Sequence, residues 1–267
     1  MKIGKATVPR SAITTSNAQT IVVRGLDLSR DLIGQVNFAD YFHFLLTGRK
    51  PDAAASAVLN ATLVAIADHG LVPSVQAARM TYAAAPEALQ GAVAAGILGC
   101  GSVILGASET AGRMFVEIDE EAKRRGGDLR EAARAVVAGR RDRKQAIPGY
   151  GHPEHKERDR RVDALFAVSR QAGAGQHFVE IAQIVEELVP GIVGKDLRLN
   201  VSAAIPAVLL GVGFPVGALK GVPILARTAS LIAHLNEEMS DPIGFALSYQ
   251  AMREFEYTGA MPQEGGK

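Results

Sequence analysis

The chain carries the stretch Ile147-Pro-Gly-Tyr-Gly-His152, followed by the cationic side chains Lys156, Arg158 and Arg161. Gly149 and Gly151 can adopt backbone angles that other residues avoid, so this turn can bring its amide groups and the imidazole of His152 close to a ligand. An imidazole with an ordinary pKa near ~6.5 gives or takes a proton at neutral pH. The stretch therefore predicts an anion-binding turn with His152 as its acid/base, whereas an isolated histidine would be interpreted as a helix cap.

On both sides of this turn the pattern is helical. Residues 54–67 are rich in alanine and leucine, and residues 109–125 place their apolar side chains on one stripe at helical spacing. Asp128 is expected to cap the next helix, with Glu131 as its capping-box partner. Further helices are predicted for residues 160–171, 178–188, 202–211, 219–236 and 243–255. Strand-like alternation is limited to Thr20–Val23, so the sequence predicts an all-α fold.

Composition excludes several classes of protein. A chain of 267 residues that is 48% hydrophobic can bury a full core, and a net charge of +1 argues against a dedicated nucleic-acid binder. The single Cys100 cannot form an internal disulfide, and no charged-apolar-small leader opens the chain, so a cytoplasmic location is expected. The apolar run 203–219 contains two prolines, which argues against a membrane span.

The glycine turn resembles the Pro-Gly-Phe-Gly-His motif of the citrate synthase superfamily. Other segments resemble the family's blocks in the same order: residues 24–27 with 42–51, 68–74 with 77–79, 101–109, 199–202 and 226–234. Together these six ordered segments cover most of the chain. The short length, with Ala67–Gly70 and Gly112–Phe115, is most similar to stand-alone citryl-CoA lyases and the lyase domain of ATP-citrate lyase.

This resemblance implies a two-domain helical fold. A large domain would comprise residues 1–106 and 211–267, and a small domain, residues 107–210, would close over it to exclude water from a cleft. The family also implies a homodimer or a higher homo-oligomer. The nearly continuous apolar stretch Ala88–Leu105 would suit a helix at that interface, and a central core helix is the alternative explanation.

The resemblance further implies that His69, His152, Arg161 and Arg227 bind the carboxylates and the hydroxyl or carbonyl oxygen of oxaloacetate or citrate. Arginine suits this role because its guanidinium forms two parallel hydrogen bonds to a carboxylate. Arg227 is the only charged residue between Lys220 and Glu237, so we expect it to meet an anion or a buried acid. Arg161 is otherwise explained as a solvated helix charge, and His69 as a helix C-terminal cap. His234, also in a matched block, is expected to be a satisfied core or inter-helix histidine.

Two positions depart from the family pattern. Citrate synthases use a histidine to polarise the thioester carbonyl and an aspartate to remove a proton, and these positions here are Ile104 and Ser202. Isoleucine cannot donate a hydrogen bond, and serine is a poor base without a partner. We interpret Ser202 as the N-cap of the helix that begins there, and count Gly149, Gly151 and Ser202 as possible contacts to substrate oxygens.

Three hypotheses of function remain open. The first is a lyase or acyltransferase that makes or breaks a C–C bond between an acyl-CoA and a keto acid such as oxaloacetate. The second is a protein that binds acyl-CoA or polycarboxylate without turnover, and the third is an enzyme that cleaves a different acyl-CoA.

Lys156 and Arg158 are candidate coenzyme A contacts, whereas the run Arg140–Lys144 also fits a solvated helix end. Coenzyme A would enter as a thioester substrate, and no metal is expected because the histidines and Cys100 show no zinc spacing.

Overall fold

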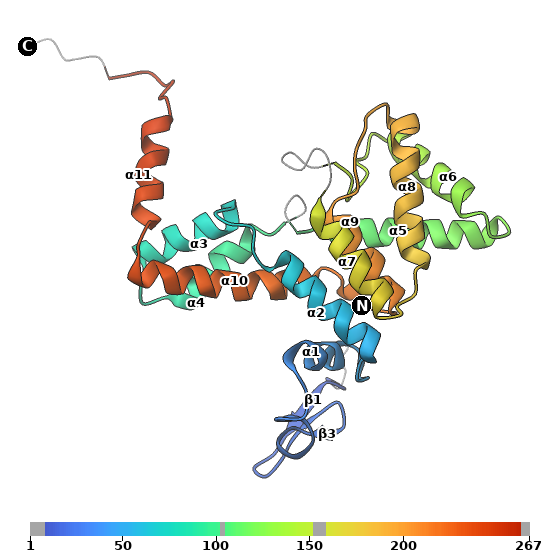
Figure 1. Cartoon of the computed structure of the whole chain (residues 1–267). Coiled ribbons are helices and arrows are strands. Elements are labelled where there is room, and N and C mark those ends of the chain that lie inside the picture. The colour runs from blue at the N-terminus through green and yellow to red at the C-terminus, as the bar shows by residue number, and fades with distance from the viewer. Residues whose placement is uncertain (1–8, 102–104, 152–158, 263–267) are drawn as a thin grey trace, which may run out of the picture. The chain divides into compact units, whose positions relative to one another are not determined.

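The computed structural model describes residues 9–101, 105–151 and 159–262 (Figure 1). Its contacts divide the chain into two compact units. Unit 1 comprises Met1–Ile66 and Leu105–Pro223, and unit 2 comprises Ala67–Ile104 and Ile224–Lys267. The described residues are mostly helical, which confirms the all-α prediction. The division into a large domain of residues 1–106 and 211–267 and a small domain of residues 107–210 stays a prediction.

Unit 1 begins with a small antiparallel sheet and two helical segments. The elements are β1 (Thr14–Ser16), β2 (Ile21–Val23), β3 (Leu26–Asp27), a π-helix (Leu28–Leu32) and α1 (Phe38–Thr47), with strand order β1-β2-β3. Val23, Leu32 and Phe44 form their buried core. The Arg24 guanidinium donates to the Leu45 carbonyl oxygen through Nε at 2.9 Å, which ties the sheet to α1. The strand-like alternation at Thr20–Val23 corresponds to β2, whereas β1 and β3 were not expected from the sequence.

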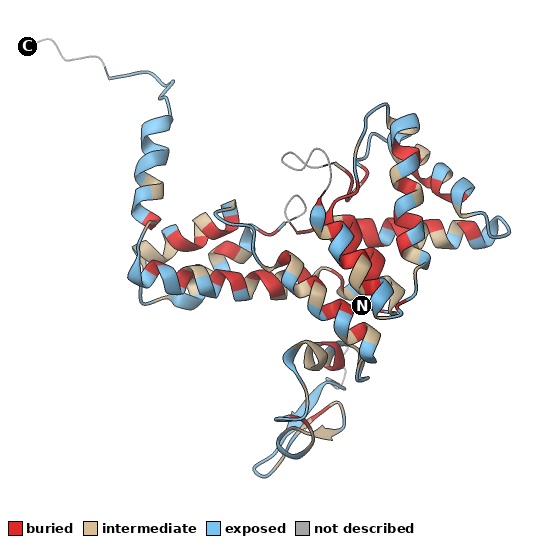
Figure 2. Cartoon of the chain, in the orientation of Figure 1, coloured by how far each residue is buried: buried red, intermediate tan, exposed pale blue. Residues whose placement is uncertain are grey.

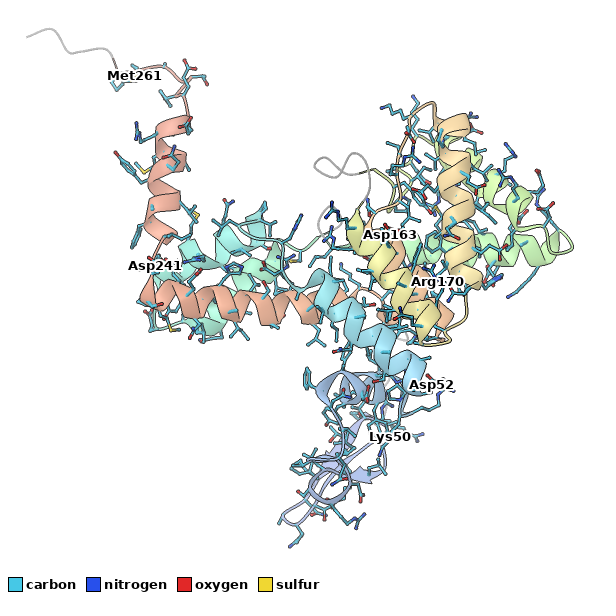
Figure 3. All side chains as sticks on the ribbon, viewed as in Figure 1. Lys50, Asp52, Asp163, Arg170, Asp241 and Met261 are labelled. Carbon is cyan, nitrogen blue, oxygen red and sulfur yellow. The ribbon has the colours of Figure 1, made fainter. Side chains whose placement is uncertain are left out.

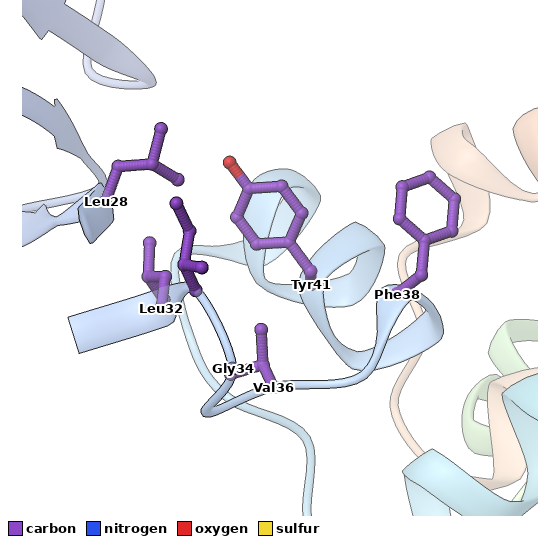
Figure 4. Close-up of a pocket in the computed structure, with 7 residues that line it drawn as sticks. Leu28, Leu32, Gly34, Val36, Phe38 and Tyr41 are labelled. Atoms are coloured by element: carbon purple, nitrogen blue, oxygen red, sulfur yellow. The ribbon is translucent and has the colours of Figure 1, made fainter. Parts of the chain in front are cut away.

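Figure 4 shows an apolar pocket in this part of unit 1. It measures about 200 Å³ and is lined by Leu28, Leu32, Ile33, Gly34, Val36, Phe38 and Tyr41. None of these residues carries a charge, so the pocket lacks the cations that a carboxylate ligand requires. From α1 the chain continues into α2, which spans Ala53–Ala67 and matches the predicted helix at residues 54–67.

The rest of unit 1 packs around one buried helix. The elements are α5 (Ala107–Arg124), α6 (Leu129–Asp142), α7 (Arg160–Gln171), α8 (His177–Val193), α9 (Val201–Gly211) and a 3-10 turn (Val216–Ala218). In α9, Val201 and residues 203–209 are buried, and α5, α7 and α8 contact it (Figure 2). Gly112 of α5 permits this close packing, because a Cβ there would lie 3.0 Å from the Pro206 side chain. Asp128 caps α6 as predicted, accepting from the Glu131 amide at 2.9 Å.

Unit 2 contains α3 (Pro73–Ala84), α4 (Leu89–Leu98), α11 (Gly244–Glu254) and most of α10 (Gly221–Ser240). Its core consists of Val75 and Ala78 from α3, Ala92 from α4, and Leu231 and Leu235 from α10. The predicted continuous helix at Ala88–Leu105 is wrong, because α4 ends at Leu98 and Gly99 follows as its C-cap. Leu105 has a φ of 66°, which is incompatible with a helix interior.

A buried ion pair fixes the turn between α10 and α11. Arg79 of α3 is 2% exposed, and its Nε donates to Glu238 Oε2 at 2.5 Å. Glu238 is also buried and accepts hydrogen bonds from the amides of Ile243 and Gly244. The Asp241 carbonyl, at the turn labelled in Figure 3, accepts from Arg79 Nη2 at 3.0 Å. The start of α11 is therefore held by charged hydrogen bonds as well as by apolar packing.

Helix α11 leaves its large apolar side chains exposed. Phe245, Tyr249 and Met252 follow one another at helical spacing and are between 62% and 68% exposed. Within the described residues, the helical stretch Val216–Ser240 is long and apolar enough to cross a membrane by length and composition alone, and 39% of its apolar window is buried. Core helices of water-soluble proteins satisfy the same criteria.

Candidate functional site

The glycine turn is joined to the segment that precedes α9. Gly151 donates to the Arg198 carbonyl at 2.7 Å, and Asn200 donates through its amide to the Gly149 carbonyl at 3.0 Å. The Asn200 side chain donates to the Gly151 carbonyl at 2.6 Å. These bonds fix the position of the backbone immediately before His152, the proposed acid/base.

Gly149 is required both by its backbone angle and by its surroundings. Its φ is +84°, and a Cβ at this position would lie 2.8 Å from the Ala203 nitrogen and 2.5 Å from the Ala203 Cβ. Gly151 has a φ of +83°. The turn therefore lies directly against the first turn of α9, where helix amide groups carry partial positive charge.

The start of α9 corrects one prediction. Asn200, not Ser202, is the N-cap, and its side chain accepts from the Ser202 amide at 2.9 Å. Ser202 is the second residue of the helix and is partly buried. Asparagine and serine are equally good N-caps, so the sequence Asn200-Val-Ser202 left the choice open. Ser202 still lies beside the glycine turn through the shared partner Asn200.

Asp159 holds Arg161, and sequence reasoning missed this acid. Asp159 is 3% exposed and accepts from Arg161 Nε and Nη2, both at 2.9 Å, and from the Val201 amide at 3.0 Å. Burial raises the pKa of Asp159, but hydrogen bonds from Arg161 and Val201 outweigh it and leave the pKa below its usual value. Arg161 is therefore held in one orientation and does not behave as a freely solvated charge. The signal for Asp159 was its place immediately before a predicted helix, typical of an N-cap.

Arg227 is a buried cation. It is 3% exposed, and among the described residues its Nε and Nη1 atoms have no hydrogen-bond partner. An unpaired buried guanidinium is costly, so the position favours a bound anion.

Cys100 is influenced by the charge of Arg227. Burial raises the pKa of the Cys100 thiol, and the opposing effects of Arg227 and Ser74 are smaller, which agrees with an unreactive thiol.

Asp68, which follows α2, is bonded to the helix that carries Arg227. Asp68 Oδ2 accepts from Ser230 Oγ at 2.6 Å and from His234 Nε2 at 2.8 Å. His234 was expected to be a satisfied core or inter-helix histidine, and its hydrogen-bond partner Asp68 lies in the turn after α2. His69 is the next residue along the chain and is exposed. Helix α2 ends at Ala67, two residues before it.

The predicted site residues fall into two described groups. Gly149, Gly151, Arg161 and Ser202 lie together in unit 1, and His69 and Arg227 belong to unit 2. His152, Lys156, Arg158 and Ile104 lie outside the described residues.

The Arg140–Lys144 run is engaged locally. Arg140 donates to Glu117 at 3.1 Å, and Arg141 donates to Asp142 at 2.7 Å and to the Ile192 carbonyl at 3.2 Å. A role of this run in binding phosphates stays a prediction. No group of three or more His, Cys, Asp or Glu side chains that could hold a metal ion occurs within residues 9–101, 105–151 and 159–262.

The sequence and the fold are similar to those of known proteins. A family model described as "Citrate synthase, C-terminal domain" matches residues 6–244. The structure of citryl-CoA lyase from Hydrogenobacter thermophilus is similar, with a TM-score of 0.84, 32% identity and 97% of each chain covered. ATP citrate lyase from Methanothrix soehngenii, in complex with citrate and coenzyme A, shares the fold with a TM-score of 0.76 at 24% identity, over 98% of this chain and 43% of that one.

Citrate synthases are also similar in sequence. The Haloferax volcanii enzyme is 25% identical over 209 residues, covering 77% of this chain and 52% of the relative. The Synechocystis enzyme is 29% identical over 212 residues, covering 77% and 51%. The chain spans about half the length of the curated relatives it matches. Because the family model extends over most of the sequence, the chain belongs to the citrate synthase family.

Proposed function

We propose that the protein cleaves citryl-CoA into acetyl-CoA and oxaloacetate. The observation that carries the proposal is Arg227, a buried guanidinium whose Nε and Nη1 have no partner among the described residues. A carboxylate of the substrate would supply the missing acceptor. The likeness to a citryl-CoA lyase over 97% of both chains supports this choice of substrate.

In this proposal the described residues bind and orient the citryl group. Within unit 2, Arg227 and His69 would bind carboxylates of the substrate. Within unit 1, Arg161 is held by Asp159 through two hydrogen bonds of 2.9 Å and is a candidate carboxylate contact. An arginine fixed by a buried acid loses less conformational freedom on binding than a solvated one. The glycine turn would place His152 at the tertiary hydroxyl, with Lys156 and Arg158 as coenzyme A contacts.

Cleavage would begin at the hydroxyl group. His152 takes its proton, the bond between the carbinol carbon and the thioester methylene breaks, and the electron pair passes to the acetyl-CoA enolate, which takes a proton from water. Neither Ile104 nor Ser202 is needed to remove a methyl proton in this direction. Synthesis by the usual citrate synthase route would require a base at Ser202 and a hydrogen-bond donor at Ile104. Cleavage passes through the same enolate, so its oxygen still needs a hydrogen-bond donor, for which Ser108, Ser202 or a bound water is the candidate.

A cleavage assay tests the proposal. Purified protein is incubated with citryl-CoA, and acetyl-CoA and oxaloacetate are followed by mass spectrometry. We expect release by the wild-type protein and much slower release by His152→Ala, because His152 supplies the acid/base step. Folded protein that releases neither product would contradict the lyase proposal.

The altered positions Ile104 and Ser202 support a second candidate, which is binding of acyl-CoA or polycarboxylate without turnover. An apolar Ile104 beside a thioester would also suit a less polar acyl-CoA as a cleavage substrate. Citrate or coenzyme A binding without cleavage would select the binding role. Release of acetyl-CoA from another branched or β-keto acyl-CoA would select the alternative substrate.

Arg227 gives a separate prediction. Arg227→Leu is expected to abolish the thermal stabilisation that citrate gives the wild-type protein, which at 100 times Kd amounts to about 2.7 kcal/mol. Without ligand, the same variant should be at least as stable as wild type, since a buried unpaired charge has been removed. Differential scanning fluorimetry with and without citrate measures both effects. Citrate stabilisation that persists in Arg227→Leu would exclude Arg227 from the site.

A homodimer and a cytoplasmic location stay predictions. The exposed apolar side chains of Phe245, Tyr249 and Met252 on α11 support self-association, because contiguous exposed apolar groups mark interaction surfaces.

A further inference from the structure

Asp68 receives hydrogen bonds from two separate segments of unit 2. Its Oδ1 accepts from the Gly70 amide at 3.0 Å, while its Oδ2 accepts from Ser230 Oγ at 2.6 Å and His234 Nε2 at 2.8 Å. These residues adjoin a pocket of about 310 Å³ that is lined by Ala67, Asp68, Ser230, Ala233, His234 and Glu237. The carboxylate thus connects the turn at residues 68–70 to α10.

Stability alone does not explain this arrangement. The Asp68 side chain is 51% exposed, and ion pairs with so exposed a partner contribute little to folding. Burial raises the pKa of Asp68, but the hydrogen bonds from Ser230, Gly70 and His234 outweigh it and hold the pKa well below its ordinary value. The group is therefore ionised at neutral pH and accepts all three bonds. Glu237, the other acid in the pocket, is paired with Arg79 Nη1 at 2.5 Å.

The connection determines where the backbone of His69 lies. Gly70 has a φ of +69°, so the bond from its amide to Asp68 closes a tight turn with His69 at its centre. On α10, Ser230 and His234 follow Arg227 by three and seven residues, which places all three on one face of the helix. Asp68 therefore anchors the turn that carries His69 to the face that carries Arg227.

We propose that Asp68 is a positioning residue, which sets His69 relative to Arg227 so that both can bind carboxylates of one ligand. This inference rests on the proposed function, since it gives the two residues a shared ligand. It assigns no contact with substrate to Asp68, Ser230 or His234. The role predicts that loss of the Asp68 carboxylate weakens ligand binding only through His69.

A double-mutant cycle on the full chain tests this coupling, with citrate as the probe and calorimetry as the measurement. Asp68→Asn and His69→Ala are each expected to weaken citrate binding about tenfold, the effect of one lost charged hydrogen bond. The double variant should bind no more weakly than His69→Ala, because the Asp68 effect needs His69. Coenzyme A affinity should be unchanged in all three variants. A general loss of folding would lower coenzyme A affinity as well, so this measurement separates the two explanations.

Two further variants guard against misfolding. Ser230→Ala removes one donor to Asp68 and should weaken citrate binding in the same direction, but less. Thr228→Val is the matched control on α10, since its hydroxyl bonds the Ile224 carbonyl at 2.8 Å, and it should leave citrate affinity at the wild-type value.

Three outcomes would overturn the inference. Independent effects, which multiply to about a hundredfold loss in the double variant, would mean that Asp68 does not act through His69. Unchanged citrate affinity in both Asp68→Asn and Ser230→Ala would remove the role altogether. If the wild-type protein binds no citrate, the proposed carboxylate site is overturned together with the role of Asp68. This outcome is distinguished from the first two because it is seen without any variant.

Discussion

Replacing Glu238 by alanine is expected to lower the free energy of unfolding by about 3–5 kcal/mol, because the buried Arg79 would keep only one carboxylate, that of Glu237, whose side chain is 60% exposed. The side chains of Arg79 and Glu238 are 3% and 1% exposed, so water cannot replace the lost partner. The amides of Ile243 and Gly244 lose their acceptor as well. Urea unfolding followed by circular dichroism measures the loss.

A matched control separates burial from charge. Glu187→Ala breaks the ion pair with Arg130, whose side chains are 60% and 52% exposed, and should cost less than about 1 kcal/mol. A Glu238 effect of similar size would show that the buried pair does not determine the stability of unit 2.

The Glu238 effect should also depend on pH. Burial raises the pKa of Glu238, but its hydrogen bonds lower the pKa by more than burial raises it. The folded-state pKa therefore lies below the ordinary value of 4.5. The stabilisation is therefore present above that value and is lost as the pH falls below it.

Gly149→Ala is expected to destabilise the protein by about 3–5 kcal/mol and to reduce any cleavage activity. An alanine there must take a left-handed backbone angle, which costs about 1–2 kcal/mol. Its Cβ would also meet the nitrogen and Cα of Ala203 at 2.8 and 2.9 Å, atoms that cannot move without distorting α9. Relief of this clash would shift the turn that leads to His152. Urea unfolding and the citryl-CoA assay measure the two effects.

Gly173→Ala is the control for backbone angle without the clash. Gly173 has a φ of +70°, and a Cβ there meets no atom within 4 Å. Gly173→Ala should lower the free energy of unfolding by about 1 kcal/mol and preserve activity. Equal losses in the two variants would mean that the contact with Ala203 is unimportant.

The helices with clear periodicity could be predicted from the sequence, and those that depend on tertiary packing could not. Residues 54–67 gave the correct helix because alanine and leucine favour it throughout. The helix expected over Ala88–Leu105 was wrong, because a nearly continuous apolar stretch carries little information on where a helix ends. The Gly99 cap and the positive φ of Leu105 are visible only in the structure.

The candidate site shows the same division. Arg227 could be predicted because it is an unaccompanied charge in an apolar helix, and the structure finds it buried. The bonds from Asp159 to Val201 and from Asp68 to Ser230 and His234 could not be predicted, because these partners are distant in sequence. Arg79 matched a family block, yet its partner Glu238 gives it a structural role.

The discontinuity of unit 2 has a consequence for protein synthesis. The ribosome completes α3 and α4 long before α10, whose Leu231 and Leu235 cover their apolar faces. At ~5–20 residues per second, the delay between Leu98 and Gly221 is roughly 6–25 s. During this interval Val75, Ala78 and Ala92 lack their native neighbours Leu231 and Leu235. We therefore expect the core of unit 2 to be completed only after α10 has been synthesised.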